Sequence, residues 1–331
     1  MKIAIIGSKD FDSLEYHLND TLETMGHEIF HVDLNDVIPV NIRYNQLLRL
    51  LSKKYDDYIF NKIANKVIES KPDLVIAVYR FIHPNCIKTI KSNLKNVKVI
   101  HINPDAITTF DLQQIFASEY DAWYTKDPFI VDFMKNKMKL NTFYFPEALN
   151  PKVHKPYEGD RVDTEKKVDI DVVSFGNMYP YRQKMLEEII KSGVNLSIFG
   201  VHNKRFFNPL IKENFRNEFI TGDRKAEIIT GSKIVFNNFH YAEIESVNVK
   251  FFEINGIGGF QLCDYKKVLE EYSPIDPEKY SYKSIDEAIE KIKYYLEHPQ
   301  ERYEIANLQC EHFHENHTYE VRLNEVLNYF F

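Results

Sequence analysis

The chain contains KIAIIG at residues 2–7 and IDVVSFG at residues 170–176, two apolar runs that each end in a glycine. A segment suited to an amphipathic helix follows each glycine, and another apolar run follows each helix. This order of strand, glycine turn, helix and strand is typical of a βαβ unit. Because the unit opens twice in a chain of 331 residues, we expect an α/β protein with two similar lobes facing a central cleft.

Further apolar runs extend both lobes. Strands are predicted at residues 29–33, 74–78, 97–102, 122–125, 142–145, 195–199, 234–237 and 259–263. Residues 150–167 have prolines, a glycine and clustered charges without an apolar period, as is typical of a linker. We therefore predict a first domain over residues 1–150, a linker over 151–167, a second domain over 168–315 and a final helix over 316–331. The aromatic end of this helix is expected to pack back on the first lobe.

Composition excludes some classes of protein. A hydrophobic fraction of 44% indicates a folded chain. The 42 basic and 49 acidic residues are mixed and give a net charge of -7, which disfavours nucleic acid as a partner. Three scattered cysteines, Cys86, Cys263 and Cys310, favour a reducing cytoplasm over a disulfide framework.

No apolar run reaches the ~20 residues of a membrane span, so we expect no transmembrane segment. Peripheral membrane contact through a Lys-rich helix such as residues 184–191 is left open, although mixed charge is more typical of a solvated face. The sequence does not indicate an oligomeric state.

The most informative stretch is ESVNVKFFEINGIGGFQLC at residues 245–263. A helix is expected to begin near Asn248, and its N-terminal N–H groups suit a diphosphate. Lys250 lies in the first turn, and Glu253, one turn deeper, suits hydrogen bonds to ribose hydroxyls. Glu245 is placed to face a sugar. The alternative is that Glu253 merely caps or solvates the helix, and that Gly256, Gly258 and Gly259 merely turn the chain.

The second half resembles the CgeB-like (spore maturation protein type) glycosyltransferases, which are related to retaining enzymes with a Glu-x7-Glu signature. The matching segments, in family order, are DVVSFGNMYPYR (171–182), LSIFG (196–200), SKIVFNN (232–238), NVKFFEINGIGGFQLCDY (248–265) and HTYEVR (317–322). The first lobe is similar only in style, through GHEIFHVD (26–33) and FPEALNPKVHKP (145–156). The resemblance implies a GT-B fold of two Rossmann-like lobes, with the donor in the second lobe and the acceptor in the first.

The resemblance also implies roles for individual residues. Gly176 and Asn177 correspond to the loop facing the donor diphosphate, and Arg182 to a phosphate partner. Lys250 stands where the family usually has Arg, which loses the bidentate geometry of a guanidinium. Glu253 corresponds to the ribose-binding glutamate. Glu245 corresponds to the first signature glutamate by spacing.

Chemically, such an enzyme must stabilise negative charge on a departing nucleoside diphosphate. Arg182, Lys250 and the helix start at Asn248 are the candidates for this role. No metal is required, and activity is expected to survive a chelator. Tyr179 and His240 (with Tyr181) lie in segments expected to line the cleft, although aromatic residues often serve only packing.

In the first lobe, HINPDAITTFD at residues 101–111 follows a predicted strand and contains His101, Asp105 and Asp111. An inverting reaction needs a base there, and Asp105 is the candidate. An N-cap is an equally good interpretation of Asp105. The histidines His312, His314 and His317 lack the spacing of a metal site.

We therefore expect a glycosyltransferase that takes a sugar from a nucleoside-diphosphate donor, with UDP the first choice of nucleotide. The acceptor is a glycan, protein or small molecule. No separate cofactor is expected. Two alternatives stay open: a nucleotide-sugar epimerase of the same fold, and a two-lobed ligand-binding protein without catalysis, because fold does not dictate function.

Overall fold

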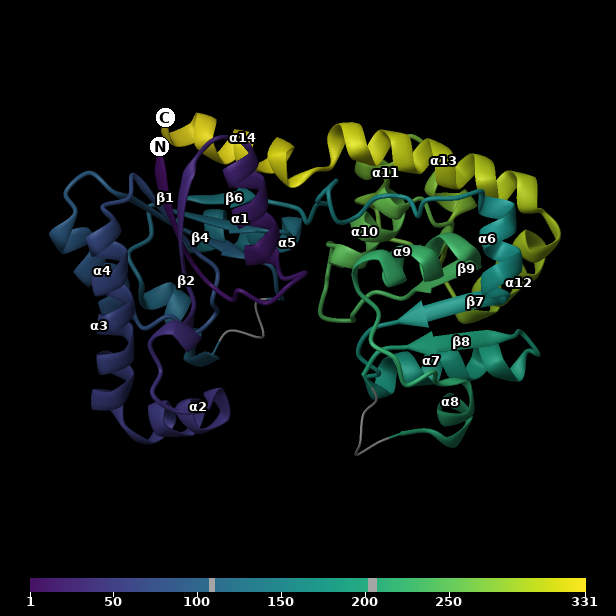
Figure 1. Cartoon of the computed structure of the whole chain (residues 1–331), viewed down its shortest axis with the longest axis horizontal. Coiled ribbons are helices and arrows are strands. Elements are labelled where there is room, and N and C mark those ends of the chain that lie inside the picture. The colour runs from purple at the N-terminus through teal and green to yellow at the C-terminus, as the bar shows by residue number, and fades with distance from the viewer. Residues whose placement is uncertain (107–110, 202–206) are drawn as a thin grey trace. The chain divides into compact units, whose positions relative to one another are not determined.

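A computed structural model describes residues 1–106, 111–201 and 207–331 of the chain. The chain forms two compact units, residues 1–146 together with 319–331, and residues 147–318 (Figure 1). Each unit contains one parallel β-sheet with helices packed against it.

The sheet of the first unit has the order β2-β1-β3-β4-β5-β6. Its strands are β1 (Lys2–Ile6), β2 (Glu28–Val32), β3 (Leu74–Ala77), β4 (Lys98–Asn103), β5 (Ala122–Thr125) and β6 (Thr142–Tyr144). Its helices are α1 (Leu14–Thr24), α2 (Ile42–Leu51), α3 (Lys53–Ser70), α4 (Pro84–Asn93), α5 (Pro128–Asp132) and α14 (Tyr319–Phe330), with short 3-10 segments at Leu34–Asp36 and Asp111–Ala117 and a π turn at Phe133–Lys137.

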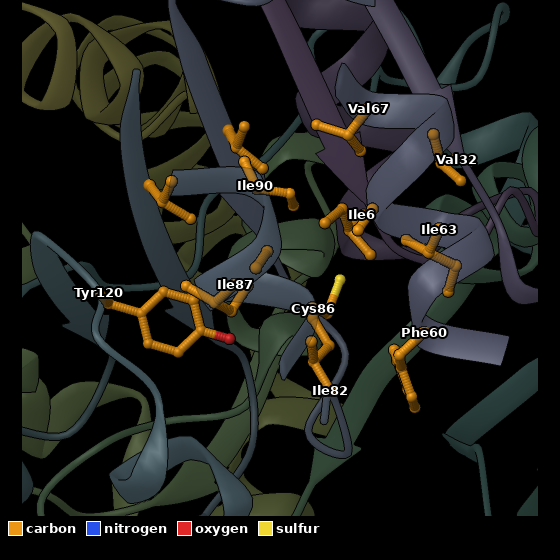
Figure 2. Packing of buried hydrophobic residues seen from close by; sticks show 14 of the residues in the cluster. Ile6, Val32, Phe60, Ile63, Val67, Ile82, Cys86, Ile87, Ile90 and Tyr120 are labelled. Carbon is orange, nitrogen blue, oxygen red and sulfur yellow. The ribbon is translucent and has the colours of Figure 1, made fainter. Parts of the chain in front are cut away.

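Helices α3 and α4 pack against each other and cover one face of this sheet (Figure 1). Their apolar residues meet those of β1 and β2 in a core that contains Ile6, Val32, Phe60, Ile63 and Val67, which are all buried. Figure 2 shows these side chains together with Cys86 from α4. The Cys86 thiol is fully buried, and burial raises its pKa above the ordinary value. This cysteine is therefore a core residue without a reactive thiolate.

The last helix packs in the first unit. Helix α14 contacts α1, and Figure 1 shows the two side by side. The ring of Tyr319 stacks on His17 with centroids 5.4 Å apart, and that of Tyr329 lies 4.5 Å from Phe143 of β6. The expectation that the final helix packs back on the first lobe is confirmed.

The sheet of the second unit has the order β11-β10-β9-β7-β8. Its strands are β7 (Ile170–Phe175), β8 (Leu196–Phe199), β9 (Ser232–Asn237), β10 (Gln261–Asp264) and β11 (Ser281–Tyr282). Its helices are α6 (Arg161–Val168), α7 (Pro180–Lys191), α8 (Pro209–Asn214), α9 (Gly222–Gly231), α10 (Val249–Ile257), α11 (Leu269–Tyr272), α12 (Ile285–Glu297) and α13 (Pro299–Asn316), with a 3-10 turn at Pro277–Lys279.

The two sheets are wound in the same way. In each, the second strand of the unit lies on one side of the first strand and the third strand lies on the other side. The chain therefore leaves β1 and β3, and likewise β7 and β9, in opposite directions. This is the topological switch point at which open parallel sheets bind ligands. The prediction of two Rossmann-like units is confirmed.

Two local expectations differ from the structure. Residues 161–167, expected in the linker, lie in helix α6, whose N-terminus is capped by the Asp160 side chain and which packs on α9. The sequence did not predict α6, because its residues are mostly charged and few of them are buried. Gly256 was expected in a turn but lies inside α10, where a Cβ would come 2.9 Å from a Leu149 methyl carbon. Close packing, rather than a turn, requires glycine there.

Candidate functional site

The candidate site lies at the switch point of the second unit, where β7 ends at Phe175 and β9 ends at Asn237. The predicted residues Gly176, Arg182 and Lys250 all follow one of these two strands. Helix α7 follows β7, and α10 follows β9 after a loop. The topology therefore brings the two predicted cations to one edge of one sheet.

Two glycine turns, at Gly176 and Gly200, lie against each other at this site. Gly176 has a φ of 110°, and its N–H donates to the Phe199 carbonyl over 3.0 Å. Gly200, with a φ of 125°, lies so close that a Cβ on it would be 2.3 Å from the Gly176 carbonyl oxygen. Both positions need glycine, because the conformation is strained for other residues and the two backbones touch.

Arg182 holds the turn in place. Its Nη1 donates to the Asn177 carbonyl over 2.9 Å and to the Phe175 carbonyl over 3.4 Å. Its Nε donates to Asn238 Oδ1 over 3.0 Å. The guanidinium is buried, which lowers its pKa below the ordinary value without making it neutral. Arg182 thus joins the exits of β7 and β9, and most of its donors already have protein acceptors.

Lys250, in the first turn of α10, reaches the same carbonyl. Its Nζ donates to the Phe175 oxygen over 3.0 Å and lies 5.3 Å from the Phe175 ring centroid. Burial lowers the Lys250 pKa well below its ordinary value, and the charge of Arg182 lowers it further. A Cβ on Gly176 would lie 3.0 Å from Arg182 Nη1 and 3.6 Å from Lys250 Nζ. Two cations therefore converge beside the glycine turn, an arrangement that an anion would stabilise.

Helix α10 begins at a capped N-terminus. Asn248 is the N-cap, and its side chain accepts from the Phe251 N–H over 3.1 Å. Its amide also donates to Asn237 Oδ1 over 2.9 Å, which ties the helix start to the end of β9. This fixes the positive end of the helix beside Lys250, where it suits a phosphate group.

Glu243 is a residue that sequence reasoning missed. It is buried, and its carboxylate accepts from the His240 N–H over 3.1 Å. Its negative charge acts to raise the pKa of both Arg182 and Lys250. The predicted Glu245, two residues later, is exposed. The signature spacing selected Glu245, and no signal in the sequence distinguished the buried glutamate from the exposed one.

Glu253 is buried inside the second unit and has cationic or polar partners there. Its Oε2 lies 3.2 Å from Lys225 Nζ of α9, and its Oε1 lies 3.6 Å from His154 Nε2. His154 Nδ1 accepts from the Asn150 N–H, so the imidazole proton is assigned to Nε2, facing the glutamate. The carboxylate therefore joins α9, α10 and the segment around His154, and its predicted ribose role must coexist with this structural one.

Four aromatic side chains form a cluster, in which Tyr179 and Tyr181 lie close enough to Arg182 to interact with its charge. The rings of Tyr179 and His240 are 5.6 Å apart edge to face, and His240 stacks on Tyr241 at 4.3 Å. Tyr181 meets Tyr241 edge to face at 5.8 Å. The three tyrosines are exposed. Exposed flat rings offer stacking surfaces for a base or a sugar.

The carboxyl group of Asp264 lies near the ring of Tyr181. Asp264 ends β10 and accepts from the Phe239 N–H over 2.5 Å. Burial raises the pKa of Asp264 to about 6, and its charge contributes to the raised pKa of Tyr181. Asp264 therefore fixes the loop after β9 and adds a carboxyl group whose pKa is raised by burial.

The predicted acceptor-side residues are in the first unit. Asp105 is exposed just beyond β4 and lies 3.4 Å from Arg80 Nη1. Asn103 Oδ1 accepts from its N–H, so Asp105 is in a polar turn. His101 is buried, and burial lowers its pKa to about 4. Its neutral, buried ring is a poor candidate for contact with an acceptor. The Asp111 side chain lies outside what the structure describes.

The switch point of the first unit has the opposite charge. Glu15 Oε1 accepts from the Ser8 N–H over 3.1 Å, beside Gly7. Asp33, after β2, accepts from the Lys9 N–H over 2.9 Å and from Tyr79 OH over 3.0 Å. Burial raises the pKa of Glu15, with a smaller contribution from the Asp33 charge. Two carboxylates therefore bind the backbone N–H groups that follow this glycine turn.

The histidines near the C-terminus contact backbone groups. His314 Nε2 lies 2.8 Å from the Gly256 carbonyl, and His317 Nε2 lies 2.9 Å from that of Tyr272. His312 pairs with Asn316. These contacts give each of the three rings a partner within the protein. Among the helices that the structure describes, none is long and apolar enough to cross a membrane.

Part of the chain matches a known protein family. Residues 182–328 match the family described as glycosyl transferase-like. The matched residues include Arg182, Lys250 and the whole α10 segment described above. The chain is also 22% identical to spore protein CgeB of Bacillus subtilis (strain 168) in an alignment of length 220 that covers 56% of this chain and 66% of that protein. The matched region thus spans just under two thirds of that relative.

Solved structures agree on the fold of the whole chain. Sucrose-phosphate synthase from Thermosynechococcus elongatus superposes with a TM-score of 0.69 at 11% identity, over 99% of this chain and 98% of that one. The β-glucosyltransferase of phage T4, in complex with its UDP-glucose substrate, superposes with a TM-score of 0.58 at 13% identity, over 100% and 99%. The phage enzyme has also been solved with UDP and Mn²⁺. The predicted CgeB-like resemblance and GT-B fold are confirmed.

Proposed function

We propose that the protein transfers a glycosyl group from a nucleoside-diphosphate sugar to an acceptor hydroxyl, and that the switch point of the second unit binds the donor. The observation that carries the proposal is the convergence of Arg182 and Lys250 on the Phe175 carbonyl, beside Gly176 and the N-terminus of α10. Charge, backbone N–H groups and lack of a side chain at Gly176 together suit a diphosphate.

In the proposed reaction, the bond between the anomeric carbon and the β-phosphate oxygen breaks, and the acceptor oxygen bonds to that carbon. The electron pair leaves with the diphosphate, so negative charge develops beside Lys250. The ammonium stabilises that charge, and Arg182 contributes mainly by fixing the Gly176 turn. Because a bound diphosphate favours the charged form of Lys250, donor binding should raise the lowered pKa of this lysine.

The aromatic cluster of Tyr179, Tyr181, His240 and Tyr241 is proposed to contact the nucleoside or the sugar. UDP is the first choice of nucleotide, because the phage relative was solved with UDP-glucose. The primary test is thermal unfolding with UDP, GDP, CDP or ADP, because ligand at 100 times its Kd should stabilise the folded state by about 2.7 kcal/mol. Failure of all four to raise the Tm would refute the donor site.

Turnover separates the enzymatic alternatives. A glycosyltransferase releases UDP from a UDP-sugar faster when the acceptor is present, whereas an epimerase converts the UDP-sugar to its isomer without any acceptor. A ligand-binding protein would bind the nucleotide and do neither. Assays with and without EDTA test the proposal that the two cations suffice; loss of activity in EDTA, restored by Mn²⁺, would contradict it.

Glu253 is proposed to accept hydrogen bonds from the ribose while it stays paired with Lys225. Truncation to Ala would remove both oxygens beside the buried Lys225, whereas Gln keeps one acceptor oxygen and the size of the side chain, so Glu253→Gln is the better variant. The ribose role predicts that Glu253→Gln weakens UDP binding but leaves binding of a dideoxyribose analogue unchanged. An equal loss for both ligands would assign Glu253 a structural role alone.

Glu245 is proposed to contact the sugar of the donor rather than the nucleotide, in keeping with its exposed position. Asp105 is proposed as the proton acceptor if the reaction inverts configuration. Asp105→Asn should then lower kcat and leave UDP affinity unchanged. A wild-type kcat in this variant would contradict the role as proton acceptor. The contact of Asp105 with Arg80 would then indicate a structural role.

A reducing compartment, the cytoplasm, is proposed as the location. All three cysteines are free, and Cys86 and Cys263 are buried in the two units. Burial raises the pKa of both thiols. This pattern suits a protein that never meets an oxidising environment.

A further inference from the structure

Helix α2 of the first unit has its polar side turned toward the protein. Asn45 is buried, and its Oδ1 accepts from Tyr55 OH over 3.1 Å. Arg49 Nε donates to Asp56 over 2.5 Å, and its Nη2 donates to the Phe81 carbonyl over 3.1 Å. Among the α2 side chains that the structure describes, the polar residues Asn45 and Arg49 therefore attach the helix to the rest of the unit.

The opposite side of α2 is apolar and exposed. Tyr44 is 67% exposed, Leu47 54%, Leu50 71% and Leu51 75%. Residues spaced by three and four positions share one helix face. Surface helices normally turn such a face to the core, so α2 is inverted. Figure 1 shows α2 at the tip of α3, away from the sheet of its unit. An apolar face of this size in contact with water indicates an interaction site.

The charge around this face selects its partner. Residues 40–54, VNIRYNQLLRLLSKK, contain four basic residues and no acidic one, although the whole chain has a net charge of -7. Arg49 is paired with Asp56, while Arg43, Lys53 and Lys54 are exposed. Leucines flanked by unpaired cations are typical of a helix that lies in the interface of an anionic bilayer.

We infer that α2 and the start of α3 form a peripheral membrane anchor, with the leucine face inserted into an anionic lipid surface. A second copy of the chain is a less suitable partner for this face. A symmetric pairing of two such helices would bring the basic residues of one copy near those of the other, and like charges would oppose it. This anchor differs from the Lys-rich helix of residues 184–191, whose lysines are paired with Glu187 and Glu188.

The test is sedimentation of the full chain with vesicles of phosphatidylcholine alone, or with about one third phosphatidylglycerol. The protein should sediment with the anionic vesicles and much less with the neutral ones, and high salt should weaken the binding. The variant Leu47→Gln/Leu50→Gln/Leu51→Gln should lose at least about tenfold in vesicle affinity, because each leucine loses its transfer energy. Lys53→Gln/Lys54→Gln should weaken binding by roughly tenfold or more.

A matched control is Val162→Gln/Phe219→Gln/Leu308→Gln, which removes three exposed apolar side chains from the second unit. It should bind vesicles like the wild type. Each variant should keep the Tm of the wild type and its shift with UDP, because none of these side chains is in a core or in the donor site. Absence of wild-type binding to anionic vesicles, or equal binding by the leucine variant, would overturn the inference. So would light scattering that shows a dimer, lost only in the leucine variant, without vesicle binding.

Discussion

The two switch points have the same topology and opposite chemistry. In the first unit, the helix after the glycine turn turns a carboxylate toward it: a Cβ on Gly7 would lie 2.3 Å from Glu15 Cγ. In the second unit the corresponding helix presents a guanidinium, with Arg182 Nη1 3.0 Å from a Cβ on Gly176. The residue after the neighbouring strand is Asp33 in the first unit and Gly200 in the second.

The difference in charge between the two switch points indicates where an anion can bind. In the first unit, the N–H groups of Ser8 and Lys9 already donate to Glu15 and Asp33, so carboxylates of the chain itself take the place that a phosphate would take. In the second unit, Lys250 and Arg182 share a neutral carbonyl. The same winding of the chain therefore carries two different charge patterns, and the proposed function assigns the diphosphate to the cationic glycine turn.

The largest effect is expected at Gly200. Gly200→Ala should lower the free energy of unfolding by about 3 kcal/mol or more, because the new methyl group would meet the Gly176 backbone as well as adopt a strained φ. The control Gly193→Ala has a φ of 85° and open space around it, so it should cost only about 1 kcal/mol. Urea unfolding measures both, and equal losses would show that the two glycine turns do not need their close approach.

The second-largest effect is expected from removal of the Lys250 charge. Lys250→Met should lower UDP affinity by roughly 10- to 100-fold, since a hydrogen bond to a charged group contributes about 1.5–3 kcal/mol. The matched variant in the first unit is Lys9→Met, which removes the cation paired with Asp36. UDP affinity should be unchanged in Lys9→Met. Titration calorimetry measures both, and a comparable loss in Lys9→Met would remove the distinction between the two switch points.

A smaller effect is expected from pH. The Lys250 pKa is lowered in the free protein, so the lysine loses its proton at a lower pH than an ordinary lysine. Rising pH should therefore weaken UDP binding already below the pH at which an ordinary lysine loses its proton, and binding in that range should take up a proton. Lys250→Arg keeps its charge over this range and should flatten the profile. A wild-type profile as flat as that of Lys250→Arg would show that the lysine charge is not involved.

The smallest effect is expected at Glu15. Its folded-state pKa is raised above 4.5, so the folded state holds the proton more tightly than the unfolded chain, and stability should fall as the pH rises through and above 4.5. Glu15→Gln keeps an acceptor for the Ser8 N–H and should show a smaller fall between pH 4.5 and 7. Unfolding at several pH values measures it; identical slopes would mean that the Glu15 carboxyl is not held in a raised-pKa environment.

Much of the fold could be predicted because its signals are local. The apolar runs before Gly7 and Gly176 mark β1 and β7, and Asn248 is the N-cap of α10, within one residue of the predicted helix start. Strand β11 was missed because two residues, Ser281 and Tyr282, carry no periodic signal.

The site was predicted less completely because its contacts are not local. Residue spacing indicated Glu253 but could not reveal Lys225 and His154, which reach it from distant parts of the chain. Spacing also selected the exposed Glu245 rather than the buried Glu243. A side chain's direction depends on tertiary packing, and a single sequence does not encode it in any readable period.

The central claim is that a diphosphate binds at the cationic switch point and not at the acidic one. A crystal structure of the full chain with UDP tests it most directly. Phosphate oxygens are expected within hydrogen-bonding distance of Lys250 Nζ, beside Gly176 and the first turn of α10. Diphosphate bound beside Gly7, or bound in the second unit away from Lys250, would contradict it.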